Sequence, residues 1–156
     1  GGIVIEIVEL LREWYSSFEV KEEKWNEKYE GILIRIEGDG NYKRCRLAHK
    51  TASKMGYFTV FWQKDGNGKN IPFYEQDEVE DLIIVIKDGR WKGLFIIPKE
   101  VAVSKGILSS ANSQGKMAMR FYPPWCSDLN RTALVTQRWQ LNYFIDLSRN
   151  NEGVTT

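Results

Sequence analysis

The stretch LIIVIKDGRWKGLFII, residues 82–97, decides the fold of this 156-residue chain. Residues 82–86 are continuously apolar, which is typical of a strand covered on both faces. Asp88-Gly89 follows as a hairpin-turn signal, and residues 91–97 return as the partner strand. The stretch therefore predicts a buried β-hairpin near the centre of a sheet.

Strand-like runs occur on both sides of this hairpin. Asp39-Gly40 between two such runs predicts a second hairpin, and residues 57–63 are rich in aromatic and β-branched residues. The six predicted strands comprise residues 32–36, 42–48, 57–63, 82–86, 91–97 and 117–122.

Helical patterns lie toward the two ends of the chain. Apolar residues at helical spacing predict helices over 3–16 and 134–147, and Pro98 and Gly106 delimit a short helix over 98–105. Residues 20–29 could form a further helix or an ordered loop. The order predicts the α+β class: a twisted, mixed, mostly antiparallel sheet of about six strands with N- and C-terminal helices packed on it.

The length of the chain favours a single domain over residues 1–156. Within it, Gly1-Gly2 could be a cloning remnant, and residues 149–156 are interpreted as a flexible tail.

The formal net charge is only +1, so no global field directs the chain toward nucleic acid or membrane. The charge is nevertheless uneven along the sequence. Residues 42–69 carry seven Lys or Arg against one Asp, a balance of +6, and residues 86–120 have a balance of +5. The run 75–81 between them carries five carboxylates and no cation, a balance of −5. We therefore expect a two-faced molecule.

Cysteine and histidine are scarce. Cys45 and Cys126 form no CxxC pair, and His49 is the single histidine, which argues against a zinc site and a disulfide framework. We therefore expect no cofactor and a cytoplasmic location. No apolar run approaches the roughly 20 residues of a membrane span, and residues 1–6 do not resemble a signal peptide. We therefore expect no membrane partner.

The first candidate site is cationic. Arg44 and Arg46 lie two apart on a predicted strand, so their side chains point to one face and Cys45 points to the other. Lys50 and Lys54 follow directly after this strand. A phosphate or other anionic ligand requires such a convergence of cations. The alternative is the solvated face of a half-exposed strand.

A second set of candidate residues surrounds a proline turn. The segment YPPW, residues 122–125, cannot continue a regular element, because proline lacks an N–H donor and fixes φ. Lys116 and Arg120 precede it on one strand face, and Tyr122 and Trp125 would form an aromatic rim. In the alternative interpretation, Arg120 makes a structural cation–π contact with Trp125 or Tyr122.

Gln137 and Gln140 lie three residues apart, which places them on one helix face. Their amides offer the donors and acceptors that a nucleobase requires. Alternatively, the two glutamines brace the proline turn.

Glu30 and Asp81, each next to a predicted strand, are weak candidates for catalysis. A metal-dependent nuclease holds two or three acidic groups and a Lys around Mg²⁺. The usual (Glu/Asp)-x-Lys triplet does not occur at the matching hairpin, where Arg44 and Arg46 stand instead. The sequence therefore predicts no catalytic residue and no metal ligand with any strength.

Three blocks of sequence resemble the MepB family and occur in the order of the family pattern. The similarity runs from about residue 30 to residue 147. The blocks are RLAHKTASKMGYFT (46–59) with Trp62, GLFIIPK (93–99) with residues 105–107, and GKMAMRFYPPW (115–125) with TQRWQLNYF (136–144). The chain departs from the family pattern at His49, Ala52 and Met117, where Lys, Pro and Arg are usual. The resemblance implies a fold similar to PD-(D/E)xK nucleases, whose acidic triad is not clearly preserved here.

Three functions stay open. The first is binding of nucleic acid or another anionic ligand through a basic face rimmed by aromatic residues. The second is a protein-interaction or regulatory module that uses the acidic run 75–81. The third is a divalent-metal nuclease that uses Glu30 and Asp81 with Mg²⁺. We rank them as binding, interaction and nuclease, so we lean away from an enzyme.

Overall fold

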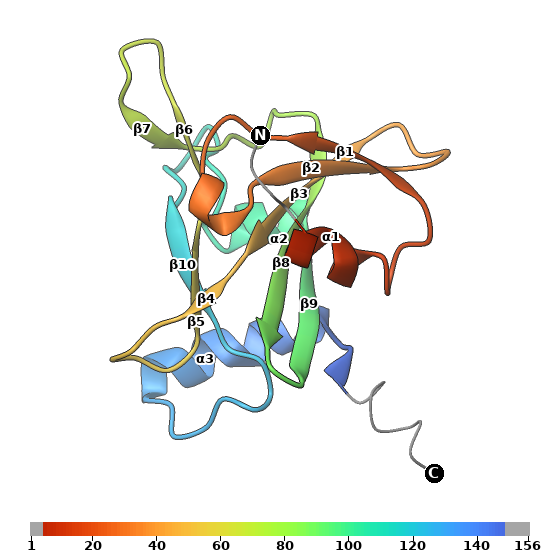
Figure 1. Cartoon of the computed structure of the whole chain (residues 1–156). Helices are drawn as coiled ribbons and strands as arrows, with labels where there is room; N and C mark the ends of the chain where they lie inside the picture. The colour runs from red at the N-terminus through yellow and green to blue at the C-terminus, as the bar shows by residue number, and fades with distance from the viewer. Residues whose placement is uncertain (1–4, 149–156) are drawn as a thin grey trace.

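The centre of the molecule is the hairpin of β8 (Val79–Asp88) and β9 (Trp91–Pro98). The computed structural model describes residues 5–148 and is shown in Figure 1. Residues 81–88 of β8 pair antiparallel with residues 91–98 of β9, and Gly89 makes the turn with a φ of 62°. The predicted central hairpin is therefore confirmed, and β8 extends beyond the apolar run at both ends.

The hairpin lies within a six-stranded sheet of order β1-β2-β3-β8-β9-β11. Its other strands are β1 (Phe18–Glu22), β2 (Ile32–Ile36), β3 (Tyr42–Leu47) and β11 (Phe144–Asp146). Neighbouring strands in this sheet are antiparallel except for β3 and β8, which are parallel. The predicted α+β class and mixed, mostly antiparallel sheet are confirmed. Similarity to the PD-(D/E)xK fold stays a prediction.

Two of the predicted strands belong to a second, smaller sheet of order β10-β5-β4. Its strands are β4 (His49–Lys50), β5 (Tyr57–Val60) and β10 (Ala118–Phe121). The strand predicted over 57–63 is interrupted at Phe61, whose side chain is buried and whose N–H donates to the Met117 carbonyl at 2.8 Å. The chain then enters a hairpin of β6 (Trp62–Lys64) and β7 (Asn70–Pro72), which projects from the body in Figure 1.

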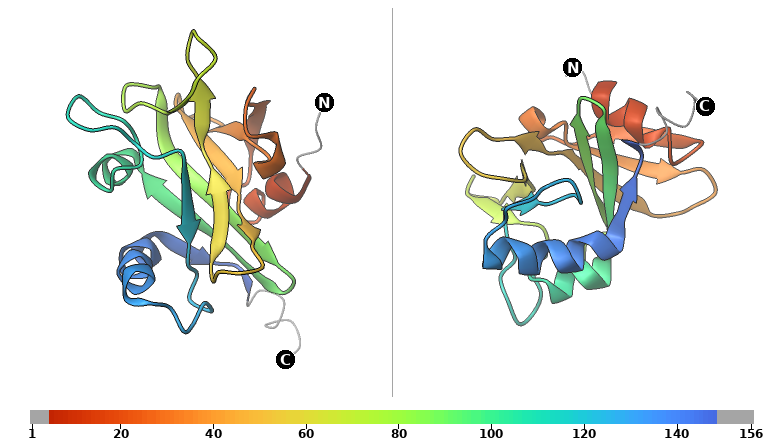
Figure 2. Two further views of the ribbon diagram at one scale, coloured as in Figure 1. Left: turned by 90° about the vertical axis from the view of Figure 1, so that its left-hand side faces the viewer. Right: turned by 90° about the horizontal axis from the view of Figure 1, so that it is seen from below.

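Both faces of the main sheet are covered. The helices are α1 (Ile5–Leu11), α2 (Lys99–Ser104) and α3 (Arg131–Gln140). Ile83 and Val85 of β8 pack in the core on the α1 side. Ile84 and Ile86 pack in a separate core with the second sheet, α2 and α3, which lie on the opposite side (Figure 2). Alternate residues of a strand face opposite sides of the sheet. Because both faces of β8 are covered, its residues must be apolar at consecutive positions, which explains the continuous apolar run.

The helix predicted over 3–16 needs correction, and residues 20–29, for which a further helix and an ordered loop were both open, form no second α-helix. Within the described residues α1 ends at Leu11. Residues 20–29 contain the end of β1 and a single 3-10 turn, η1 (Glu27–Tyr29), in place of a second α-helix. The helix predicted over 98–105 is confirmed as α2.

The last predicted helix is also shorter than expected. After α3 the chain tightens into the 3-10 turn η2 (Leu141–Tyr143) and then forms β11. Phe144 pairs with Phe95 of β9, and their ring centroids lie 4.7 Å apart. A Cβ atom at Gly93 would overlap the Phe144 ring. Pairing with β9 therefore overrides the helical period of residues 141–147.

The cloning-remnant and flexible-tail predictions concern residues 1–2 and 149–156, which lie outside the described residues. Along residues 5–148, no helix has the length and apolar character needed to cross a bilayer.

Candidate functional site

Two hollows border the loop between β4 and β5. The first has a volume of about 420 Å³ and the second of about 400 Å³. Both are lined by Ser53, Lys54 and Met55, so they meet along this loop. We call the two hollows together the loop groove. Its size and position make it the candidate binding site of the chain.

Gly56 closes the loop where it enters β5. Its φ is 86°, and an added Cβ would lie 2.6 Å from Cε1 of Tyr122. Only glycine combines this backbone conformation with such a close approach. The contact holds the loop against the proline turn that follows β10.

A chain of hydrogen bonds lies at the first hollow. Trp125 donates from Nε1 to Tyr57 Oη at 2.8 Å, and Tyr57 donates to Asp88 Oδ2 at 2.6 Å. Lys50 Nζ lies 3.4 Å from the same carboxylate oxygen. Burial and the bond to Asp88 raise the pKa of Tyr57 well above its ordinary value, so the phenol stays a donor.

Two further side chains define the wall of the first hollow. Trp91 stacks on Trp125 with ring centroids 5.3 Å apart, and 38% of Trp91 remains exposed. Cys126 also lines the hollow, but burial raises the pKa of its thiol. A protonated, buried thiol is a poor nucleophile, so the cysteine acts here as part of the wall.

The second hollow carries the cation of β10. Arg120 lies over the Phe58 ring at 5.6 Å and donates from Nη1 to the Met55 carbonyl at 3.3 Å. Because Arg120 and Phe58 are register partners, the aromatic contact is with Phe58, whereas the alternative interpretation of the sequence had named Trp125 or Tyr122. Tyr122, Asp128 and the first turn of α3 complete the lining.

The structure therefore brings together Lys50, Lys54, Arg120, Tyr122 and Trp125 of the predicted site residues. Lys116 is exposed but lines neither hollow.

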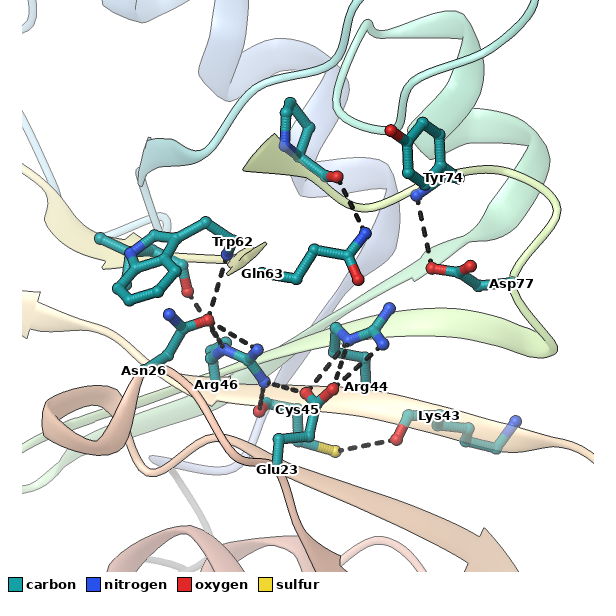
Figure 3. A network of polar contacts seen from close by, with 12 residues as sticks. Glu23, Asn26, Lys43, Arg44, Cys45, Arg46, Trp62, Gln63, Tyr74 and Asp77 are labelled. Atoms are coloured by element: carbon teal, nitrogen blue, oxygen red, sulfur yellow. Dashed lines mark hydrogen bonds and ion pairs between the residues drawn. The ribbon is translucent and has the colours of Figure 1, made fainter. Parts of the chain in front are cut away.

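Arg44 and Arg46 share one strand face as predicted, but that face is buried (Figure 3). Arg46 has no exposed surface and bonds Glu23 Oε1 at 2.6 Å and Asn26 Oδ1 at 2.7 Å. Arg44 also pairs with Glu23 at 3.0 Å and lies 3.5 Å over the Phe73 ring. Because all these groups are held by the fold, the two arginines do not contribute to the loop groove.

Gln137 and Gln140 brace the proline turn, which is the alternative that the sequence left open. Gln137 Nε2 donates to the Tyr122 and Pro123 carbonyls at 3.2 and 3.0 Å. Gln140 accepts from the Tyr122 N–H at 2.9 Å and donates to the Arg120 carbonyl at 3.0 Å. Their amides are therefore engaged by the backbone rather than directed into the groove.

Glu30 and Asp81 take part in separate contacts. Glu30 accepts from the Ile7 N–H of α1 at 3.2 Å, and burial raises its pKa. Asp81 pairs with Lys43 at 2.7 Å, and Lys43 also pairs with Glu80. Among residues 5–148, no three His, Cys, Asp or Glu side chains are grouped as a metal site would require.

Several groove residues are absent from the sequence-based set, and three of them, Asp88, Tyr57 and Trp91, make the hydrogen bonds and the ring stacking at the first hollow. The sequence pattern places Asp88 in a turn, and Tyr57 and Trp91 in strands. A usable signal was the placement of Trp91 between Arg90 and Lys92, directly after a turn, because cations interleaved with an aromatic ring are typical of nucleic-acid contacts.

Comparisons with known proteins agree with the sequence resemblance. The model of the MepB-like family matches residues 23–146. The fold is similar to the crystal structure of MepB, with 38% sequence identity and a TM-score of 0.81 over 91% of this chain and 97% of that chain. No curated protein matches the sequence. Both the family model and the solved structure cover most of the chain, and the chain belongs to the MepB-like family.

Proposed function

We propose that this protein binds single-stranded nucleic acid in the loop groove. The observation that carries the proposal is the meeting of two hollows along one loop, with three cations and an exposed indole at their borders. Membership of the MepB-like family supports a shared scaffold and does not by itself supply the ligand.

The cations are suited to phosphate groups. The Lys50 side chain is 72% exposed, and Lys54 lies on the exposed part of the loop. Arg120 is half-buried and is oriented by Phe58 and the Met55 carbonyl. A flexible pair of lysines beside a fixed guanidinium can follow a backbone of repeated phosphates.

The aromatic residues favour a single strand over a duplex. Trp91 stacks on Trp125, the Arg90 guanidinium lies 4.7 Å from the Trp91 ring centroid, and the residue remains exposed at the first hollow. Aromatic rings and arginine guanidinium planes both stack on unpaired bases regardless of sequence, so Trp91 and Arg90 together offer a stacking platform. Bases in a duplex are already stacked on each other, so they cannot use this platform.

The test is fluorescence anisotropy with short labelled single strands and duplexes of DNA and RNA. Titrations at about 50 and 200 mM salt should show binding of single strands that weakens steeply with salt. Lys50→Ala/Lys54→Ala should lower the affinity, and the salt slope should fall by about 0.7 for each phosphate that the variant no longer binds.

The matched control is Lys21→Ala/Lys69→Ala, which removes two exposed lysines that do not line the groove. Equal effects of the two double variants would contradict the proposed site, and salt-insensitive binding would contradict phosphate recognition. Parallel titrations with Mg²⁺ and with EDTA would reveal cleavage, whose dependence on Mg²⁺ would favour a nuclease instead.

A further inference from the structure

The first hollow contains an acceptor and a donor side by side. Asp88 is a carboxylate whose side chain is 30% exposed, and both Tyr57 and Lys50 approach its Oδ2 atom. No described residue bonds its Oδ1 atom in the structure. A carboxylate accepts and an ammonium donates, so the pair offers a defined polar pattern to a ligand.

A carboxylate would be out of place in a groove that recognised phosphate alone, because the two anions repel. Its orientation is nevertheless fixed by Tyr57, which is itself held by Trp125. The carboxylate lies in the same hollow as Trp91, where the proposed stacking of a base would occur. Asp88 is therefore placed to contact the edge of that base.

The four bases differ in what their edges present. Guanine offers two adjacent donors, N1–H and the N2 amino group, next to the O6 acceptor. The two donors match a carboxylate in a bidentate arrangement, and O6 matches an ammonium. Adenine, cytosine and uracil or thymine each offer one donor beside acceptors that a carboxylate repels.

We propose that the first hollow selects guanine, with Asp88 accepting from the guanine N1–H and N2 amino groups, Lys50 donating to O6, and the platform of Trp91 and Arg90 stacking on the ring. The inference rests on the proposed function, because it assigns the preferred base of the same groove. Tyr57 acts as a positioning residue that holds the carboxylate.

The experiment measures binding of thymine-rich DNA single strands that carry one central guanine, hypoxanthine, adenine or cytosine. Hypoxanthine differs from guanine by the loss of the N2 amino group alone. The guanine strand should bind about tenfold more tightly than the adenine strand, with the hypoxanthine strand between them. Asp88→Asn should abolish the preference, because an amide cannot accept from both donors.

The control variant is Asp65→Asn, which changes another turn aspartate outside the groove. It should keep the guanine preference. The comparison of guanine and hypoxanthine in the wild-type protein needs no variant, so it decides between selection and its absence even if Asp88→Asn unfolds.

Equal binding of all four strands would overturn guanine selection and leave the proposed function intact. A preference that survives Asp88→Asn would overturn the role of Asp88. If no strand binds in a salt-sensitive manner, the proposed function fails first and the inference fails with it.

Discussion

The buried charges beside Glu23 allow a quantitative prediction about folding stability. The Glu23 carboxylate bridges Arg46, which has no exposed surface, and Arg44, which is 7% exposed. Glu23→Gln keeps the side-chain size and removes the charge that compensates two guanidinium groups. Breaking a buried ion pair by removing one partner costs about 3–5 kcal/mol, so we expect a loss of that order in the free energy of unfolding.

Urea unfolding at neutral pH measures this loss, and Glu19→Gln provides the matched control. Glu19 pairs with Arg35 at 2.8 Å, but its side chain is 65% exposed. An exposed pair contributes at most about 1 kcal/mol, because water screens it. If the two variants lose similar free energy, the buried cluster is not a determinant of stability and the reasoning is refuted.

The pH dependence gives an independent check. Burial alone would raise the Glu23 pKa, but Arg46 and Arg44 together hold it below the ordinary value of 4.5. A lowered folded-state pKa means that the contribution is complete above 4.5 and is lost as the pH falls through the folded-state pKa. The difference between wild type and Glu23→Gln should therefore shrink at acid pH.

Two further predictions concern β9 and the groove. Gly93→Ala should lower the free energy of unfolding, measured by urea titration, by about 1–3 kcal/mol, because the added Cβ overlaps the Phe144 ring. The control is Gly66→Ala, which should leave the free energy of unfolding nearly unchanged because no atom lies within 4 Å of the added Cβ. Trp91→Ala should weaken the binding of single strands by about 1–3 kcal/mol without changing the salt slope. The control is Trp14→Ala, which removes another exposed indole and should preserve the affinity.

Local patterns were sufficient for the centre of the fold. The apolar run of β8 and the Asp88-Gly89 turn define a hairpin among residues close together in the sequence, and burial on both faces follows from the composition alone. The alternation of Arg44 and Cys45 likewise predicted correctly that the two side chains face opposite sides of β3. These features depend on neighbours in the sequence.

Features that depend on distant partners could not be predicted in this way. β11 exists because Phe144 pairs with Phe95, although the local period of residues 141–147 is helical. Arg46 is buried because Glu23 and Asn26, which precede it by 23 and 20 positions, fold over it. A charge count does not reveal whether a cation already has an internal partner.

The same dependence on partners distant in the sequence explains why the charged segments do not form separate faces. β3 and β8 are parallel neighbours, and Lys43 lies opposite Asp81 in register. Lys43 also pairs with Glu80, so the acidic run meets the start of the basic segment inside the fold. The basic segment is therefore divided into a buried part on β3, neutralised by carboxylates, and an exposed part on β4, the following loop and the hairpin of β6 and β7.

This division limits the charge that a ligand can use. Lys50, Lys54 and Arg120 line the groove, whereas the cations of β3 are held in internal ion pairs. Three phosphate contacts correspond to a salt slope of about −2 for a single strand. A measured slope near this value would agree with a site confined to the loop groove. A much steeper slope would show that cations beyond the groove contact the strand, and the site would then have to be extended along the surface.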